Sequence, residues 1–384
     1  MVMSDTWAVL FGGPSPEHEI SILTGLQSER VLTAAGHTVS AIYWAPSGGW
    51  YLVPQGTEAQ DYLEGVPAGS RAIDVRVGEN PGLFLKKRFG EDRLDPAAVL
   101  VCLHGGIGEG GGAAALFAVL GIPATGSSLF AGAVGMDKLA FGGLMATAEI
   151  PSLPRELLSA TRAPRFDGPY ILKPRFGGSS IGIEIVDSAE TARGVAAASV
   201  HLRAGAVVEP YRPELIDLNI SFRTSPQLEV TALERPLRGE SQAALYSYAE
   251  KYLAGGAGQE AGLTSAPRQL PADVPAEVAS TAADLARRVA EVTGLTGVAR
   301  VDLLWDEASG ELFVNEVNSI PGAMSLYLWA PQVPAATVLM DALQEARNAR
   351  PATPASGFGS GAALRAAGGI AGKLVGLDGP RANR

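Results

Sequence analysis

The chain has 384 residues, a length that suits two or three packed domains better than one. Its formal net charge of −10, with no basic stripe, argues against a general nucleic-acid-binding surface. The single cysteine, Cys102, excludes an intrachain disulfide, and no apolar run is long enough to span a bilayer. We therefore expect a cytoplasmic protein with no membrane and no nucleic-acid partner.

The N-terminal part alternates apolar strands with helices. The expected elements are strands at 7–11, 38–44 and 97–103 and helices over about 20–35 and 112–120. This alternation predicts an open parallel sheet, whose ligand crevice lies at the carboxyl ends of the strands. We expect this domain to cover residues 1–128, with Cys102 as a buried strand residue and not a reactive thiol.

Three further parts are expected after this domain: a central lobe at 129–216, a C-terminal lobe at 217–349 and a flexible tail at 350–384. The central lobe should begin with one helix that carries Met136, Asp137 and Lys138. The other expected elements are strands at 170–173, 181–186, 206–209, 218–222 and 229–234, a mobile segment at 246–262, a helix over about 274–293, a hairpin of 298–305 and 311–317, and a short helix near 362–371.

The hairpin carries the most specific chemistry. Side chains two positions apart on a strand share a face, so Arg300 lies beside Asp302 and Glu316 beside Asn318. The turn places the two pairs roughly opposite each other, and hard oxygen ligands of this kind suit Mg²⁺ that bridges substrate phosphates. The alternative is a solvated strand face with a surface ion pair. The absence of lysine and the turn at 319–322 argue against it.

A second pattern points to phosphate. Lys173 ends a strand, and a glycine-serine loop at 177–180 follows, in which backbone N–H groups and two hydroxyls can surround phosphate oxygens. The motif GxxxxGK[ST] is absent, so this is not a P-loop. A GxGxxG match at 106–111 follows a late strand and is weak evidence for a dinucleotide. A glycine-serine hairpin loop without a function remains the alternative.

Charged residues also precede the first helix. Glu17 is positioned to hold a substrate ammonium group at the mouth of the crevice, although carboxylates at helix N-termini often act only as caps. His104, on the turn after the 97–103 strand, can reach the same crevice, whereas a lone histidine is more often structural.

In their order along the chain, these motifs resemble the D-alanine–D-alanine ligase family of the ATP-grasp superfamily, over about residues 5–330. The matching blocks are WAVLFGGPSPEHEIS at 7–21, LHGGIGEGGG at 103–112, GIPATGS at 121–127, MDK at 136–138, KPRFGGSSIG at 173–182, EKY at 250–252, RVD at 300–302 and NEVNSIPG at 315–322. The resemblance implies an α/β protein of the ATP-grasp fold, with ATP between two α+β lobes and an N-terminal open parallel-sheet domain.

The resemblance also implies a role for each matching residue. The residues implied in ATP binding are Lys138, Lys173, Ser180 and Lys251 at the phosphates, Glu209 and Tyr211 at the adenine hinge, and Asp217 at the ribose. Those implied to hold two Mg²⁺, or Mn²⁺ in their place, are Asp302, Glu316 and Asn318. Those implied at the amino-acid substrates are Glu17 with Ser179 and His104 at the first amino group, Arg300 and Gly322 at the oxyanion, Tyr252 in a closing loop with Lys251, and Ser325 in the acceptor segment.

The implied reaction joins two amino acids through an acyl phosphate formed from ATP. Its simplest product is D-alanyl-D-alanine for peptidoglycan precursors. Dimers are common in that family, but no interface can be read from the sequence, so a homodimer stays open. Two alternatives stay open. One is a ligase of the same fold for another amino-acid or hydroxy-acid pair, and the other is a non-catalytic nucleotide-binding protein.

Three departures from the family pattern concern the substrate. Gly177 stands where the family usually has an acid, YSYA at 246–249 replaces Tyr-Asp-Tyr-Glu, and AMSLYLW at 323–329 replaces a Thr/Ser-rich segment. Loss of hydroxyl donors is expected to alter recognition of the second substrate. The sequence therefore leads to the hypothesis of a paralogue whose acceptor differs from D-alanine.

Overall fold

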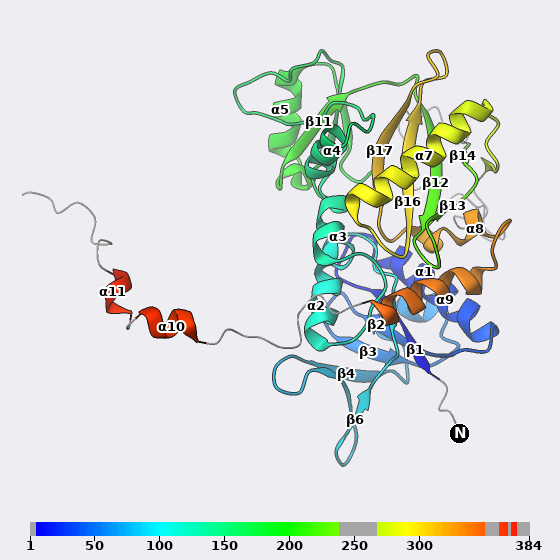
Figure 1. Cartoon of the computed structure of the whole chain (residues 1–384), viewed down its shortest axis with the longest axis vertical. Coiled ribbons are helices and arrows are strands. Elements are labelled where there is room, and N and C mark those ends of the chain that lie inside the picture. The colour runs from blue at the N-terminus through cyan, green and yellow to red at the C-terminus, as the bar shows by residue number, and fades with distance from the viewer. Residues whose placement is uncertain (1–4, 238–266, 350–360, 368–369, 375–384) are drawn as a thin grey trace, which may run out of the picture. The chain divides into compact units, whose positions relative to one another are not determined.

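The computed structural model describes residues 5–237, 267–349, 361–367 and 370–374 (Figure 1). The chain divides into one compact unit that ends at Ala349 and a separate C-terminal unit. The described part of that second unit consists of two short helices, α10 (Ala362–Ala367) and α11 (Ala371–Leu374). Among the described residues, no helix combines the length and the apolar character that crossing a membrane requires.

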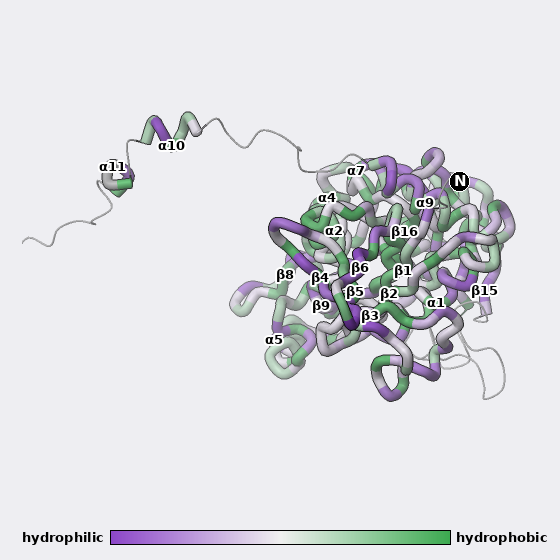
Figure 2. The backbone as a smooth tube through the Cα atoms, turned by 90° about the horizontal axis from the view of Figure 1, so that it is seen from below, coloured by the Kyte–Doolittle hydropathy of each residue, from purple (hydrophilic) through white to green (hydrophobic). Residues whose placement is uncertain are grey.

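The N-terminal sheet has seven strands in the order β6-β5-β4-β3-β2-β1-β7. They are β1 (Thr6–Gly12), β2 (Thr38–Trp44), β3 (Trp50–Val53), β4 (Arg71–Arg76), β5 (Gly82–Lys86), β6 (Glu91–Leu94) and β7 (Val99–Val101). The expected parallel pairing is confirmed for β2, β1 and β7, whereas β3 to β6 add an antiparallel meander that makes the sheet mixed. These four strands were not predicted: β4 and β6 carry several charged residues, and β3 and β5 are short apolar runs of four and five residues. Figure 2 shows the contrast between hydrophobic β1 and hydrophilic β6.

Helices pack on this sheet as the alternation predicted. They are α1 (His18–Ala34) and α2 (Ala113–Leu120), with shorter turns η1 (Ala59–Tyr62) and η2 (Gly108–Gly112). The turn from β1 toward α1 requires glycine at position 12, where φ is +92°. A Cβ atom there would lie 2.4 Å from the carbonyl oxygen of Trp44. Cys102 is fully buried in the core around this sheet, as expected, but it follows the end of β7 and is not a strand residue. Burial raises the pKa of its thiol to about 12.

The single helix predicted around Met136 is two helices, α3 (Leu129–Met136) and α4 (Lys138–Thr147). They separate at Asp137, whose carboxylate accepts the backbone N–H groups of Leu139 and Ala140 and pairs with Arg175 at 2.6 Å. An aspartate that caps a helix in this way stops the preceding helix from continuing. Lys138 consequently becomes the first residue of α4.

Two further sheets carry the predicted motifs. The central sheet, ordered β10-β9-β11-β8, contains β8 (Glu156–Leu157), β9 (Tyr170–Pro174), β10 (Glu184–Val186) and β11 (Ala206–Pro210), next to α5 (Ala189–Ala198) and η3 (Val200–Leu202). The C-terminal sheet, ordered β13-β12-β16-β17, contains β12 (Ile216–Arg223), β13 (Glu229–Val230), β16 (Val298–Trp305) and β17 (Leu312–Asn318). A small sheet pairs β14 (Arg235–Pro236) with β15 (Arg268–Gln269). The expected mobile segment at 246–262 lies outside the described residues.

Three hydrophobic cores stabilise these sheets. One lies around β9, β10, β11 and α5, and a second joins β12, β16 and β17 to α7 (Ala276–Thr293), α3 and α4. The third core, which is the largest, surrounds the N-terminal sheet and includes residues of η4 (Gly322–Ser325), α8 (Leu326–Trp329) and α9 (Ala335–Asn348). The segment that follows β17 therefore packs against the N-terminal sheet. The division into domains at 128, 216 and 349 stays a prediction.

Candidate active site

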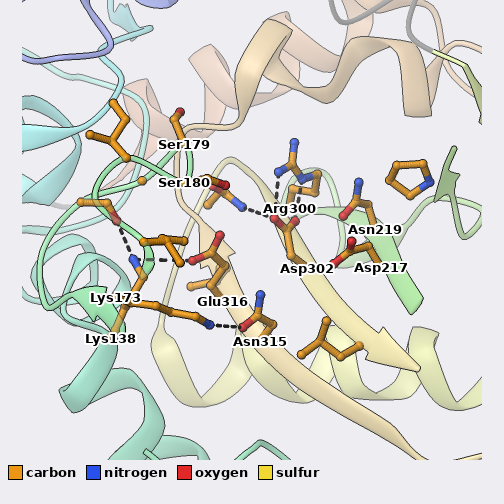
Figure 3. Close-up of a pocket in the computed structure, with 18 of the residues that line it drawn as sticks. Lys138, Lys173, Ser179, Ser180, Asp217, Asn219, Arg300, Asp302, Asn315 and Glu316 are labelled. Atoms are coloured by element: carbon orange, nitrogen blue, oxygen red, sulfur yellow. Dashed lines mark hydrogen bonds and ion pairs between the residues drawn. The ribbon is translucent and has the colours of Figure 1, made fainter. Parts of the chain in front are cut away.

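One pocket is lined by residues of the central and C-terminal sheets and of the segments that follow β1 and β7, and it gathers most of the residues that the sequence singled out (Figure 3). These are Glu17, His104, Lys138, Lys173, Ser179, Ser180, Glu209, Tyr211, Asp217, Arg300, Asp302, Glu316, Asn318 and Gly322. Lys251 and Tyr252 lie outside the described residues. Ser325 does not line the pocket.

The hairpin of β16 and β17 has the register that the sequence predicted. Asp302 pairs with Glu316, and Arg300 pairs with Asn318. The Arg300 guanidinium forms a two-pronged ion pair with Asp302, at 2.7 Å from Nε to Oδ1 and 2.9 Å from Nη2 to Oδ2. Asn318 donates from Nδ2 to the same carboxylate at 3.1 Å. The hairpin therefore brings two carboxylates, a carboxamide and a guanidinium to one patch of the pocket.

A β-bulge adds a further residue to this patch. The register shifts between Asp302 and Leu303, so that Asn315 has no partner on β16 and both Asn315 and Glu316 line the pocket. The Nζ atom of Lys173 donates to Oδ1 of Asn315 at 3.1 Å. A bulge of this kind redirects a side chain that simple strand alternation would turn away. Asn315 was not among the predicted site residues.

Cationic side chains collect at the β17 end of the pocket. Nζ of Lys138 lies 3.6 Å from Oε2 of Glu316, and Nζ of Lys173 donates to Oε2 of Glu209 at 2.8 Å. Nε of Arg155, which the sequence analysis missed, lies 3.4 Å from Oε1 of Glu209. Burial alone would raise the pKa of Glu209, but Lys173 and Arg155 lower it below its usual value. At this end of the pocket the ionised carboxylate of Glu209 therefore holds the cationic side chains of Lys173 and Arg155 in place.

The glycine-serine loop meets the N-terminal sheet at Glu17. Ser179 and Ser180 have φ values of 53° and 59°, and this left-handed backbone makes a tight loop after β9. The Ser179 hydroxyl donates to Oε1 of Glu17, the buried carboxylate that precedes α1. Two segments that are 162 positions apart in the sequence therefore join at the pocket wall.

His104 and Glu109 are two further polar residues of the pocket lining, both on the segment that follows β7. Nε2 of His104 lies 2.8 Å from Oγ1 of Thr24, and burial lowers the pKa of the histidine to about 4, so its ring stays neutral. Glu109 accepts the backbone N–H groups of Gly105 at 2.8 Å and of Ile320 at 3.3 Å. Burial and the nearby Glu17 raise the pKa of Glu109 to about 7. As an acid inside the glycine-rich 106–111 segment, Glu109 was a readable signal that the sequence analysis left unassigned.

Two family models match the chain and together cover nearly all of its compact unit. The D-ala D-ala ligase N-terminus model matches residues 6–127, and the D-ala D-ala ligase C-terminus model matches residues 133–343. The chain belongs to the D-alanine–D-alanine ligase family. The resemblance drawn from the motifs is thereby confirmed, and with it the class of enzyme, an ATP-dependent ligase.

Relatives within the D-alanine–D-alanine ligase family match over most of their length. The D-alanine–D-alanine ligase of Kineococcus radiotolerans is 33% identical over 360 residues, which cover 84% of this chain and 91% of that protein. The enzyme of the same name from a Synechococcus species is 30% identical over 343 residues, which cover 84% of this chain and 92% of that protein.

Solved structures of D-alanine–D-alanine ligase family members share the fold. The D-Ala:D-Ser ligase VanG from Enterococcus faecalis superposes with a TM-score of 0.71 at 21% identity. The match covers 90% of this chain and 100% of that one. D-alanyl-alanine synthetase A from Vibrio cholerae gives 0.72 at 20% identity, covering 90% of this chain and 99% of that one. The ATP-grasp fold predicted from the motifs is confirmed.

The acceptor segment of this D-alanine–D-alanine ligase family member differs from the sequence-based expectation. Ala323, Met324 and Ser325 all have φ near +50°, which makes a left-handed turn after Gly322. Ser325 is fully buried, and its hydroxyl has no hydrogen-bond partner among the described residues. Tyr327 lines the pocket instead. The resemblance implied that Ser325 contacts the second substrate, but after this turn its side chain does not line the pocket.

Proposed function

We propose that this ligase activates the carboxylate of one D-alanine with ATP and joins it to the amine of a second, giving D-alanyl-D-alanine for peptidoglycan precursors. The observation that carries the proposal is that one pocket holds three kinds of group side by side. Lys138 and Lys173 supply charge for phosphates, Asp302 with Glu316 supplies oxygen donors, and Glu17 supplies a carboxylate for a substrate ammonium group.

The nucleotide would occupy the end of the pocket nearest β17 and β11. We assign the triphosphate to Lys138, Lys173 and Ser180, with Lys251 added from the closing loop. Tyr211 would lie at the adenine and Asp217 at the ribose. The carboxylate of Glu209 accepts a hydrogen bond from Lys173, so we assign it the role of orienting that lysine beside the adenine hinge.

The hairpin donors fit a divalent cation. Among the described residues no group of three Asp, Glu, His or Cys side chains gathers for a metal. A cation here would therefore take the carboxylates of Asp302 and Glu316, with the carboxamide of Asn318, phosphate oxygens and water completing its shell. We propose that these residues bind two Mg²⁺ ions and that Mn²⁺ can replace them. When bound, these ions neutralise the charge of the transferring phosphate.

The protein's own groups would act on the two amino acids in sequence. Glu17, fixed by Ser179 and beside neutral His104, would hold the first ammonium group while a carboxylate oxygen attacks the γ-phosphorus and ADP leaves. The amine of the second substrate then attacks the acyl carbon. Arg300 and the Gly322 backbone N–H would stabilise the oxyanion until phosphate departs with the C–O electron pair. Tyr252, in the loop with Lys251, would help exclude water.

Two alternatives stay open beside this assignment. A different amino-acid or hydroxy-acid pair would use the same activating groups and differ only at the acceptor. A non-catalytic nucleotide-binding protein is disfavoured, because Arg300, Asp302, Glu316 and Asn318 are all present and assembled in the pocket. The cytoplasmic location stays a prediction, and a homodimer stays open.

The test is ATP-dependent phosphate release with Mg²⁺, screened over D- and L-amino acids singly and in pairs. We expect release with D-alanine alone, and a loss of at least about 100-fold in Glu316→Ala, because several kilocalories of charge stabilisation disappear. Glu311→Ala is the matched control, since Glu311 is an exposed glutamate beside the turn of the same hairpin. Release only with another pair would replace the substrate, and full activity of Glu316→Ala would overturn the proposed site.

A further inference from the structure

A row of polar residues crosses the C-terminal sheet, and only part of it belongs to the site assigned above. Glu316 on β17 pairs with Asp302 on β16, and Asp302 pairs with Asn219 on β12. An isolated bridge then pairs Asn219 with Glu234. Because neighbouring strands lie about 4.8 Å apart, Glu234 is roughly 14 Å from Glu316, at the opposite end of the row.

Glu234 is the centre of a compact group that we call the Glu234 cluster: Glu234, Asn219, Arg268 and Tyr327. All four residues line the pocket. Glu234 is 2% exposed, and its carboxylate accepts from Nη1 of Arg268 at 3.2 Å, from Nδ2 of Asn219 at 3.0 Å and from the Tyr327 hydroxyl at 3.3 Å. The guanidinium carbon of Arg268 lies 4.3 Å from the centre of the Tyr327 ring.

These contacts fix a cation in one orientation. A buried carboxylate is costly unless it is paired, and Arg268 supplies the balancing charge for Glu234. Stacking on Tyr327 holds the plane of the guanidinium. Burial raises the pKa of Tyr327, so its hydroxyl keeps its proton and continues to donate. A guanidinium has five N–H donors in a fork that matches a carboxylate, so it can hold Glu234 and a second carboxylate at once.

The position of the Glu234 cluster indicates which substrate it meets. The phosphate-binding lysines are at the β17 side of the pocket, where Lys138 approaches Glu316. Arg300 is on β16, in register with Ser221 of β12, whereas the Glu234 cluster begins with Asn219 on β12 and continues to Glu234 on the side of β12 away from β16. The amine attacks one face of the planar acyl group, so it needs room that the triphosphate does not fill. The β12 side of the pocket, where the Glu234 cluster lies, provides that room for the second amino acid.

We propose that Arg268, oriented by Glu234 and Tyr327, binds the carboxylate of the second substrate and thereby selects an amine that carries a free carboxylate. This inference rests on the proposed ligase function and adds a specificity-determining residue to it. It also accounts for the altered acceptor segment, because Tyr327 contributes to the same subsite that Ser325 does not reach. Amides and simple amines should be poor acceptors.

The experiment separates the two halves of the reaction in Arg268→Gln. Hydroxylamine traps the acyl phosphate of D-alanine as a hydroxamate and needs no acceptor carboxylate, whereas dipeptide formation needs one. We expect Arg268→Gln to form hydroxamate close to the parent rate and to lose about 10- to 100-fold in kcat/KM for D-alanine as acceptor, the range for a charged hydrogen bond. With D-alaninamide as acceptor, parent and variant should be equally slow.

Arg235→Gln is the matched control, because Arg235 is on the same two-stranded sheet and does not line the pocket. It should behave as the parent in every assay. The proposal is overturned if Arg268→Gln loses hydroxamate and dipeptide in parallel, or if its acceptor kcat/KM is unchanged. A parent that forms neither product with D-alanine would instead overturn the proposed function itself, and the inference with it.

Discussion

Glu109 shows how much one side chain can depend on the fold around it. Its carboxylate joins the turn after β7 to the backbone at Ile320, and it lies near the negative charge of Glu17. Burial and that charge raise its pKa from 4.5 to about 7. The folded protein therefore binds this proton more tightly than the unfolded chain does, and stability becomes linked to pH.

The expected consequence has a definite sign. Between pH 4.5 and about 7 the folded state keeps a proton on Glu109 that the unfolded state has released, so the free energy of unfolding should fall as the pH rises through this window. Glu109→Gln has no titrating group and should show a shallower fall. Urea unfolding at pH 5, 6 and 7 measures both slopes. Equal slopes for the parent and Glu109→Gln would refute the assignment.

Residue chemistry was more readable from the sequence than residue partnership. The strand-end pattern identified Lys173 and the family resemblance implied Glu209, yet nothing in the sequence showed that they pair with each other or that Arg155 would join them. The same holds for Glu234 and Arg268, which lie 34 positions apart. Such partners depend on how strands cross the sheet, and a single sequence without a fold does not contain that information.

At the scale of elements, the β17 strand carries a bulge that is visible in the spacing of its buried residues. Its buried residues are Leu312, Val314 and Val317, a spacing of two and then three positions. Strict alternation would keep the spacing at two. The extra position lets Asn315 and Glu316 both face the pocket, and the prediction from regular pairing found only Glu316.

Removing the bulged side chain should weaken nucleotide binding. Asn315→Ala takes away the oxygen that accepts from Lys173, and a hydrogen bond to a charged group contributes about 1.5–3 kcal/mol. We expect KM for ATP to rise by roughly tenfold with a smaller change in the KM for D-alanine. Steady-state kinetics with each substrate varied in turn provides the measurement. A rise confined to D-alanine would be inconsistent with the role given to Lys173.

The break between α3 and α4 offers a second test at this scale. Asp137→Ala removes both the helix cap and the ion pair with Arg175. Loss of such a cap costs about 1–2 kcal/mol of unfolding free energy. Because Lys138 is the next residue, KM for ATP should rise in the same variant. Asp137→Asn retains a capping oxygen and should recover most of the stability, which urea unfolding of both variants would show.

At the scale of the whole compact unit, the segment after β17 returns to the N-terminal sheet. Trp329 is fully buried in the core around that sheet, while its Nε1 donates to Oγ of Ser221 on β12 at 3.1 Å. The sequence marked this segment as apolar but could not show which core it enters. Hydrophobicity predicts burial and does not identify the neighbour.

Trp329 should therefore matter to stability and to activity together. Truncation of a buried tryptophan to alanine typically costs about 3–5 kcal/mol. We expect Trp329→Ala to lose stability in this range and to lower kcat/KM, because η4 with Gly322 and Tyr327 would be less firmly held. Trp329→Phe should be milder. Thermal unfolding and steady-state kinetics of the same variants test this. A destabilised Trp329→Ala with unchanged kcat/KM would show that the core around Trp329 does not support the active site, contrary to the prediction.

The central claim is that an acyl phosphate forms in this pocket, and oxygen transfer tests it most directly. D-alanine labelled with ¹⁸O in its carboxylate is incubated with ATP and Mg²⁺, and the released phosphate is analysed by mass spectrometry. Attack of the carboxylate on the γ-phosphorus, followed by departure of phosphate, predicts one ¹⁸O atom in each inorganic phosphate. Dipeptide formation with unlabelled phosphate, or with the label in AMP, would contradict the account.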